Sequence, residues 1–135
     1  MSYAPRVGRY MSICPFSVRQ DQPLIQAHLL MKEHRIRHLP VLDGDKLAGV
    51  ISERDLHLCE LLHAADPEAT PVREVMATDV YAASPYTPLD EVAHEMAMHK
   101  YGSTVIVDKG KVVGVFTAVD AMAALSTILA EKLPS

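Results

Sequence analysis

Tryptophan is absent from this sequence of 135 residues, and cysteines and aromatic residues are few. The two cysteines, Cys14 and Cys59, are too few for a disulfide framework, which indicates free thiols in a reducing compartment. Five tyrosines and two phenylalanines leave little material for aromatic stacking platforms. A fold held by disulfides and a surface that stacks many bases are therefore both disfavoured.

The sequence also lacks long apolar runs and an excess of basic residues. No apolar run approaches the roughly 18–20 residues that a membrane-spanning helix needs. The start of the chain, MSYAPRVGRYMSICPFSV, has no continuous apolar stretch and no small-residue cleavage site, so we expect no signal peptide, no membrane partner and a cytoplasmic protein. The net charge is −4 and the basic residues are scattered, which argues against nucleic-acid binding.

What the sequence does contain is an internal repeat. When the chain is shifted by 65 residues against itself, eleven positions between Val7/Val72 and Asp55/Asp120 carry the same residue in both copies. Average composition would give about three such identities by chance. The matched pairs are Val7/Val72, Met11/Met76, Pro23/Pro88, Leu24/Leu89, Met31/Met96, His34/His99, Asp43/Asp108, Lys46/Lys111, Gly49/Gly114, Val50/Val115 and Asp55/Asp120. We therefore predict two repeats, 4–65 and 71–133, joined by a linker at 66–70.

Each repeat has the pattern of a strand, a helix, a hairpin of two strands and a second helix. Residues 17–20 and 80–84 are predicted to be extended, and the first helices to begin at Pro23 and, capped by Thr87, at Pro88. The predicted hairpins are 38–43 with 46–52 and 103–108 with 111–117, and the second helices are 53–64 and 118–132. One repeat alone leaves apolar faces unburied. The expected fold class is therefore α/β (α+β), with tandem β-α-β-β-α repeats packed as a pseudo-two-fold pair.

The same short motif follows both hairpins. Ser52 precedes Asp55 by three residues, as Thr117 precedes Asp120, and both pairs have the spacing of a capping box at a helix start. A helix start also presents backbone N–H groups that can bind phosphate, and a carboxylate beside them can accept from ribose hydroxyls. The motif by itself is compatible with both roles.

Three longer stretches carry a family resemblance: RHLPVLDGDKLAGVISERDL, GSTVIVDKGKVVGVFTAVDAM, and VREVM at the start of the second repeat. Together the repeats resemble a stand-alone pair of CBS (cystathionine-β-synthase-type) domains, the arrangement called a Bateman module, over residues 5–133. The resemblance implies a regulatory module that is not an enzyme and requires no cofactor. Such pairs bind AMP, ADP or ATP, and in some members S-adenosylmethionine or NAD, in two clefts between the repeats.

The resemblance also implies which residues bind the ligand. Asp55 and Asp120 would hold the ribose hydroxyls, and Ser52 and Thr117 would contact ribose or phosphate. Arg54 is either a second cation there or a solvated helix residue. Contacts to base or phosphate would come from the start of the first hairpin strand, at Ile36, Arg37 and His38 and at Tyr101, Gly102 and Ser103. The adenine pocket would be lined by Ile13, Pro15, Thr78 and Val80.

The two copies differ at the start of this strand. Arg37 and His38 offer a fixed positive charge and a titratable donor, both suited to phosphate. Gly102 and Ser103 are small and neutral at the matched positions. We expect the better polyphosphate site to include Arg37 and His38, while the sequence leaves open which aspartate faces Arg37.

Other chemistry has less support in the sequence. His34 and His38 are four residues apart, but the first ends a predicted helix and the second opens a strand, so we predict no metal site. No motif marks a catalytic nucleophile or a glycine-rich phosphate loop.

The C-terminal stretch VDAMAALSTILAEKL is apolar on overlapping helix faces. This helix either packs within the pair or forms a dimer interface, and the resemblance implies dimers built through such helices. We predict a homodimer with adenine nucleotide and an unidentified protein effector as partners. Two alternatives stay open: a structural module whose motifs are only helix caps, and a subunit that regulates a transporter or dehydrogenase in trans.

Overall fold

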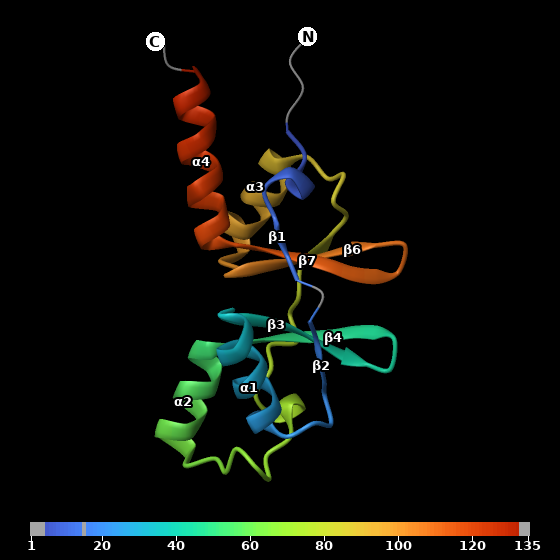
Figure 1. Cartoon of the computed structure of the whole chain (residues 1–135), viewed down its shortest axis with the longest axis vertical. Coiled ribbons are helices and arrows are strands. Elements are labelled where there is room, and N and C mark those ends of the chain that lie inside the picture. The colour runs from blue at the N-terminus through green and yellow to red at the C-terminus, as the bar shows by residue number, and fades with distance from the viewer. Residues whose placement is uncertain (1–4, 15, 133–135) are drawn as a thin grey trace. The chain divides into compact units, whose positions relative to one another are not determined.

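The computed structural model describes residues 5–14 and 16–132 and divides into two compact units (Figure 1). Unit 1 is drawn from Met1–Cys14 and Tyr81–Ser135, and unit 2 is Pro15–Val80. Unit 1 is therefore made from two stretches of chain that lie on either side of unit 2 in the sequence.

Unit 2 contains a three-stranded sheet and two α-helices. Its elements are β2 (Val18–Arg19), α1 (Leu24–His34), β3 (His38–Asp43), β4 (Lys46–Ser52), α2 (Glu53–His63) and the 3-10 helix η2 (Val72–Glu74). The strand order is β2-β3-β4, with β2 parallel to β3 and β3 antiparallel to β4. Both α-helices lie on one face of this sheet (Figure 1).

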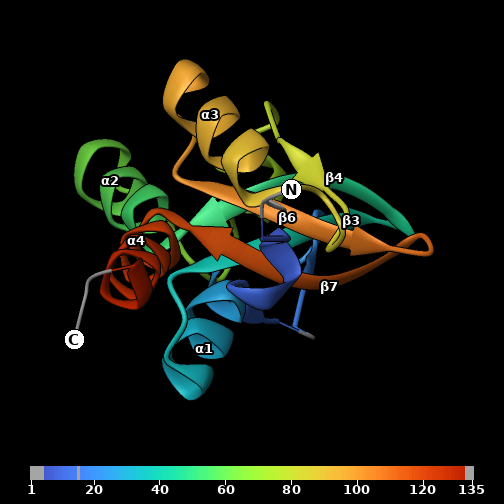
Figure 2. The same ribbon diagram turned by 90° about the horizontal axis from the view of Figure 1, so that it is seen from above.

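Unit 1 repeats this plan with one additional strand. Its elements are the 3-10 helix η1 (Val7–Arg9), β1 (Ser12–Ile13), β5 (Ala82–Ala83), α3 (Leu89–His99), β6 (Ser103–Asp108), β7 (Lys111–Thr117) and α4 (Ala118–Lys132). The strand order is β1-β7-β6-β5, and α3 and α4 lie on one face of the sheet (Figures 1 and 2). The predicted order of strand, helix, hairpin and helix is confirmed in both units.

The starts of the first helices differ from the prediction. Helices α1 and α3 begin at leucines, and Pro23 and Pro88 are the N-cap residues rather than the first helical residues. The predicted cap by Thr87 is wrong, because its hydroxyl accepts from the backbone N–H of Ser84 (3.2 Å) instead. Backbone carbonyls satisfy the helix starts, for example that of Pro5, which accepts from the Leu89 N–H at 2.7 Å.

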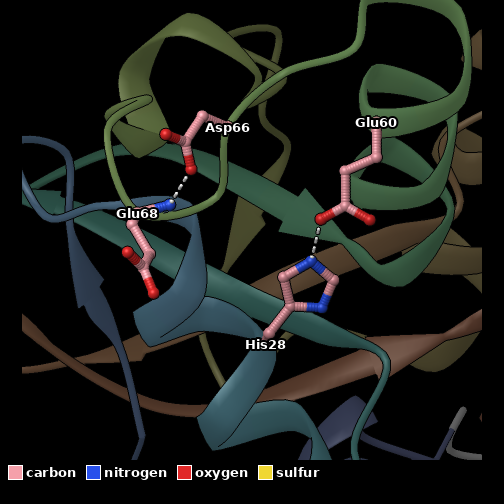
Figure 3. Close-up of polar contacts among 4 residues, drawn as sticks. All are labelled: His28, Glu60, Asp66 and Glu68. Carbon is pink, nitrogen blue, oxygen red and sulfur yellow. Dashed lines mark hydrogen bonds and ion pairs between the residues drawn. The ribbon is translucent and has the colours of Figure 1, made fainter.

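The segment predicted as a linker has a structure of its own. The Asp66 carboxylate accepts from the Glu68 N–H at 3.0 Å and closes a tight turn (Figure 3). The carbonyls of Pro67 and Thr70 then accept from the first N–H groups of α1, at 2.8 and 2.9 Å. Residues 66–70 therefore form part of the start of that helix.

The leading segment of each repeat packs against the hairpin of the other repeat. Strand β1 pairs with β7, and the backbones of Ala77 and Val50 exchange two hydrogen bonds of 2.9 and 3.0 Å. The crossing is close because Gly49 and Gly114 have no side chain. A Cβ on Gly49 would lie 2.5 Å from the Ala77 carbonyl oxygen, and one on Gly114 would lie 2.7 Å from the carbonyl oxygen of Ser12. Two of the sequence identities between the repeats thus mark backbone crossings.

Each unit has its own apolar core. In unit 2 the fully buried members include Leu24, Leu39 and Ile51, and in unit 1 they include Phe116 and Ile106. The repeat-matched methionines also lie in these cores: Met31 and Met96. These two sequence identities therefore mark core positions.

Candidate functional site

In unit 2 the turn from β4 into α2 is a complete capping box. The Asp55 N–H donates to the Ser52 hydroxyl at 3.1 Å, and the Ser52 N–H donates to Oδ2 of Asp55 at 3.0 Å. The hydroxyl at the end of a strand thus fixes the carboxylate one turn into the helix. The Asp55 side chain is half-buried, with its second oxygen, Oδ1, left out of the box.

In unit 1 the matched turn from β7 into α4 has an additional member. Thr117 and Asp120 form the same box, with 2.9 Å between Thr117 N and Asp120 Oδ2 and 3.2 Å between Asp120 N and Thr117 Oγ1. The Thr117 hydroxyl also lies 3.1 Å from Oδ2. The remaining oxygen, Oδ1, accepts from the hydroxyl of Ser12 at 2.9 Å. The sequence analysis did not predict this contact.

The first backbone N–H of each second helix is already bonded. Glu53 donates to the Arg37 carbonyl at 2.9 Å, and Ala118 donates to the Gly102 carbonyl at 3.1 Å. The capping boxes satisfy two more N–H groups at each helix start. Among the described residues, only the N–H groups of Arg54 and Val119 have no partner in these two turns. The expected row of free N–H groups for phosphate is therefore reduced to one per turn.

The same contacts place the residues predicted at the strand starts. Arg37 lies in the unit of Asp55, with its carbonyl bonded to the first residue of α2. His38 is paired across the hairpin with Ser52, as Ser103 is with Thr117. Four of the predicted strand-start residues are buried or half-buried: Ile36, His38, Tyr101 and Ser103. Arg37 and Arg54 are exposed.

The residues predicted for the adenine pocket fall in the crossing segments. Ile13 is 81% exposed in β1, which pairs with the hairpin of unit 1. Thr78 is exposed and directly follows the Ala77 bridge in unit 2, where Val80 is half-buried. Pro15 lies outside the described residues. The structure thus places the segment after Met11 in the unit of Asp120.

Aromatic rings stack at matched positions of the two units. In unit 2, Phe16 stacks on His34 with ring centroids 3.6 Å apart. In unit 1, Tyr101 lies in contact with both matched rings, 5.9 Å from Tyr81 and 5.3 Å from His99. Sequence reasoning missed these stacks, although the 65-residue register pairs Phe16 with Tyr81 and His34 with His99.

The pKa of one ring in this stack, the phenol of Tyr81, is shifted. Burial raises the pKa of the Tyr81 phenol above its usual value of 10.0, and the nearby carboxylates of Glu91 and Glu95 raise it further. The phenol is therefore neutral throughout the physiological range, available as a hydrogen-bond donor beside Tyr101.

A polar contact between helices occurs in unit 2. His28 of α1 and Glu60 of α2 lie 2.5 Å apart, Nε2 to Oε1 (Figure 3). They line a groove of about 510 Å³ together with Lys32 and His57. Asp55 does not line this groove, so the predicted ribose contact lies elsewhere. Over residues 5–14 and 16–132, no three His, Cys, Asp or Glu side chains gather closely enough to bind a metal ion.

The structure thus contains two repeats, each with a hairpin and a matched capping box. A family model described as CBS domain matches residues 7–58 and again residues 72–127. The chain belongs to the CBS domain family. The family match and the observed architecture together confirm the tandem repeat, the mixed α+β fold and the CBS pair that the sequence resembled.

Individual CBS proteins resemble the chain over most of its length. It is 32% identical over 99 residues to the CBS domain-containing protein YhcV of Bacillus subtilis, which covers 73% of this chain and 70% of YhcV. The crystal structure of AcuB from Vibrio cholerae matches with a TM-score of 0.77 at 32% identity, over 98% of this chain and 100% of AcuB. The crystal structure of CBSX2 in complex with AMP matches with a TM-score of 0.70 at 25% identity, over 92% and 98% of the two chains.

A longer enzyme also matches, but only in part. The chain is 30% identical over 105 residues to the inosine-5′-monophosphate dehydrogenase of Korarchaeum cryptofilum, yet it spans only 21% of that enzyme. The match is confined to a fraction of the dehydrogenase, so its activity is not carried over to this chain. Within the described part of this CBS pair, none of the helices combines the length and the apolarity that crossing a lipid bilayer requires.

Proposed function

We propose that this CBS pair is a non-catalytic regulatory module that binds an adenine nucleotide (AMP, ADP or ATP) and signals its occupancy to a protein effector. The observation that carries the proposal is the fixed carboxylate after each hairpin. Asp55 and Asp120 are each held by a capping box one turn into a helix, where a carboxylate can accept from the two hydroxyls of a ribose. The AMP complex of CBSX2 supports a ligand of this class.

The neighbouring residues supply the rest of a nucleotide site. In unit 2, Arg37 and His38 stand at the strand start that is bonded to the helix bearing Asp55. A guanidinium and an imidazole are suitable partners for phosphate oxygens. S-adenosylmethionine and NAD share the adenosyl group and are the alternative ligands of the same sites.

A second candidate function is a structural module in which the motifs serve only as helix caps. The observation that favours it is the number of hydrogen bonds that Asp120 already makes within unit 1. These hydrogen bonds suit the carboxylate of Asp120 to a role as a helix cap, because they leave fewer of its acceptor positions available to a ligand.

We also infer that the chain forms a homodimer. Helix α4 buries Ala124 but exposes a row of apolar side chains, Val119, Met122, Leu125 and Leu129, each at least 49% exposed. Covering these side chains in a second copy would remove apolar area from water. Sedimentation over a range of protein concentrations measures the expected dimer, and a monomer at every concentration would contradict it.

The function is tested by thermal unfolding with AMP, ADP, ATP, NAD and S-adenosylmethionine. A ligand at 100 times its Kd should stabilise the folded protein by about 2.7 kcal/mol. Asp55→Asn should reduce this shift, because the amide keeps one oxygen for the cap but offers ribose hydroxyls fewer acceptors. Asp45→Asn, on the exposed tip of the same hairpin, is the matched control.

The outcomes separate the two candidate functions. A shift with at least one of the five compounds that falls in Asp55→Asn and persists in Asp45→Asn supports the nucleotide sensor. No shift with any of them at millimolar concentration leaves the structural module as the function.

A further inference from the structure

We propose that the two carboxylates are unequal ligand sites: Asp55 is ready to bind a ribose, whereas Ser12 occupies Asp120 and weakens the site in unit 1. The inference rests on the proposed function and deepens it by assigning the first ligand to unit 2. It makes Ser12 a positioning residue that acts through Asp120. It depends on the hydrogen bonds that each carboxylate already accepts, and its test uses the residue that differs at one structurally matched position, Ser12 against Ala77.

The hydrogen bonds of Asp120 leave little room for a diol. A carboxylate has about four lone-pair positions on its two oxygens. Oδ2 of Asp120 faces two donors from Thr117, its N–H at 2.9 Å and its hydroxyl at 3.1 Å. Oδ1 faces the Ser12 hydroxyl at 2.9 Å. One position remains open, and a ribose with two hydroxyl donors needs two.

Asp55 is much less occupied. Its Oδ2 accepts from the Ser52 N–H at 3.0 Å, and within the described part of the chain its side chain accepts no other hydrogen bond. Three of its four lone-pair positions are therefore open. Both hydroxyls of a ribose can bind there without displacing any group of the protein.

The Thr117 hydroxyl accounts for one of the two additional donors on Asp120, and residue 12 accounts for the other. Ser12 is paired with Val115 on β7, and Ala77 is bridged to Val50 on β4. The two pairs are related by the same 65-residue register, so Ala77 occupies in unit 2 the place that Ser12 occupies in unit 1. Alanine has no hydroxyl to donate to Asp55.

Charge acts in the same direction as the hydrogen bonds. Arg37 and His38 belong to the unit of Asp55, and their counterparts are Gly102 and the buried Ser103. A nucleotide held by Asp55 therefore has one fixed cation, Arg37, and an imidazole for its phosphates on the same unit. We expect the first AMP bound to be the one at Asp55.

The test exchanges the two residues and measures AMP binding by titration calorimetry. To observe one site at a time, Ser12→Ala is made with Asp55→Asn, and Ala77→Ser with Asp120→Asn. A hydrogen bond to a charged carboxylate, gained or lost, corresponds to about a 12- to 160-fold change in affinity. Ser12→Ala should strengthen AMP binding at Asp120 by this factor, and Ala77→Ser should weaken binding at Asp55 by a similar one.

Both exchanged residues are exposed, so the variants should fold. Ala82→Ser, which adds a hydroxyl at an exposed position of β5, is the control and should leave both affinities unchanged. AMP binding that neither exchange alters, or stronger binding at Asp120 than at Asp55 in the single Asp→Asn variants, overturns this inference alone. Absence of AMP binding in every variant and in the unmodified chain overturns the proposed AMP function as well.

Discussion

Unit 1 and unit 2 share a hairpin, two helices and a capping box, but they differ in the groups that surround those elements. The core position at the end of the second hairpin strand holds Ile51 in unit 2 and Phe116 in unit 1. The position opposite holds Leu39 in one unit and Thr104 in the other. The comparison shows that the repeated backbone survives large changes in the side chains packed on it.

The polar contacts differ in a complementary way. Unit 2 joins its helices through His28 and Glu60, where the register puts Ala93 and Leu125 in unit 1. Unit 1 instead ties its leading strand to Asp120 through Ser12. Hydrogen bonds thus reinforce the helix pair in one unit and the turn between the hairpin and the second helix in the other, so the two copies of one fold are stabilised at different places.

The largest effect is expected from the core of unit 1. Phe116 is fully buried, so Phe116→Ala should lower the free energy of unfolding by about 3–5 kcal/mol. Phe116→Ile introduces the residue found at the matched position of unit 2. It should lower the free energy of unfolding less than Phe116→Ala does, because more of the side-chain volume is kept. Denaturant titration measures both, and amide hydrogen exchange should locate the loss in unit 1. A loss within about 0.5 kcal/mol, as for a surface change, would contradict the assignment of Phe116 to the core.

A smaller effect of opposite sign is expected at Thr104. Its hydroxyl is buried and has no hydrogen-bond partner among residues 5–14 and 16–132. Thr104→Val keeps the shape and removes the unsatisfied group, so it should raise the free energy of unfolding by about 1 kcal/mol. The measurement is the same titration, with Thr78→Val on the surface as the control. Destabilisation by Thr104→Val would show that the hydroxyl has a bonding role.

The smallest effect is a change in the alkaline stability of unit 1. The pKa of Tyr81 is raised in the folded chain, so the unfolded chain loses this proton first, and the stability that the neutral phenol contributes falls as pH rises above 10.0. Tyr81→Phe introduces the residue found at the matched position of unit 2, Phe16. It should make the loss of stability with rising pH less steep. Thermal unfolding as a function of pH measures the slope. An unchanged slope would contradict the shift, and Tyr86→Phe controls for loss of an exposed phenol.

The elements themselves could be predicted from local sequence. The four hairpin strands have the predicted bounds, because alternating apolar residues and Gly or Asp turns determine them within a few residues. Helices α2 and α4 begin where the hydroxyl and aspartate of each capping box require. Thr87 misled the prediction because a nearby turn, closed at Ser84, used its hydroxyl instead.

The arrangement of the site could be predicted only in part. Each aspartate and its capping partner are three residues apart, so the sequence motif was enough to predict both. The contact from Ser12 to Asp120 spans 108 residues, and it depends on which hairpin the leading segment crosses. The spacing of the motifs does not indicate which hairpin the leading segment pairs with. The 65-residue alignment does show that Ser12 is replaced by Ala77. The shared glycines Gly49 and Gly114 can be interpreted as sites of close backbone contact only when the segments that cross them are known from the structure.

The leading segment of each repeat pairs with the hairpin of the other repeat, and this arrangement affects the order in which the two units can fold during translation. A ribosome releases the residues of unit 2 as one uninterrupted stretch, so this unit can fold while the rest of the chain is still being synthesised. The leading segment of unit 1 is translated before unit 2, yet β7, the strand it pairs with, is translated after unit 2. During synthesis β1 therefore waits without its partner. Of the two units, unit 1 is the one whose assembly depends on translation reaching the end of its hairpin.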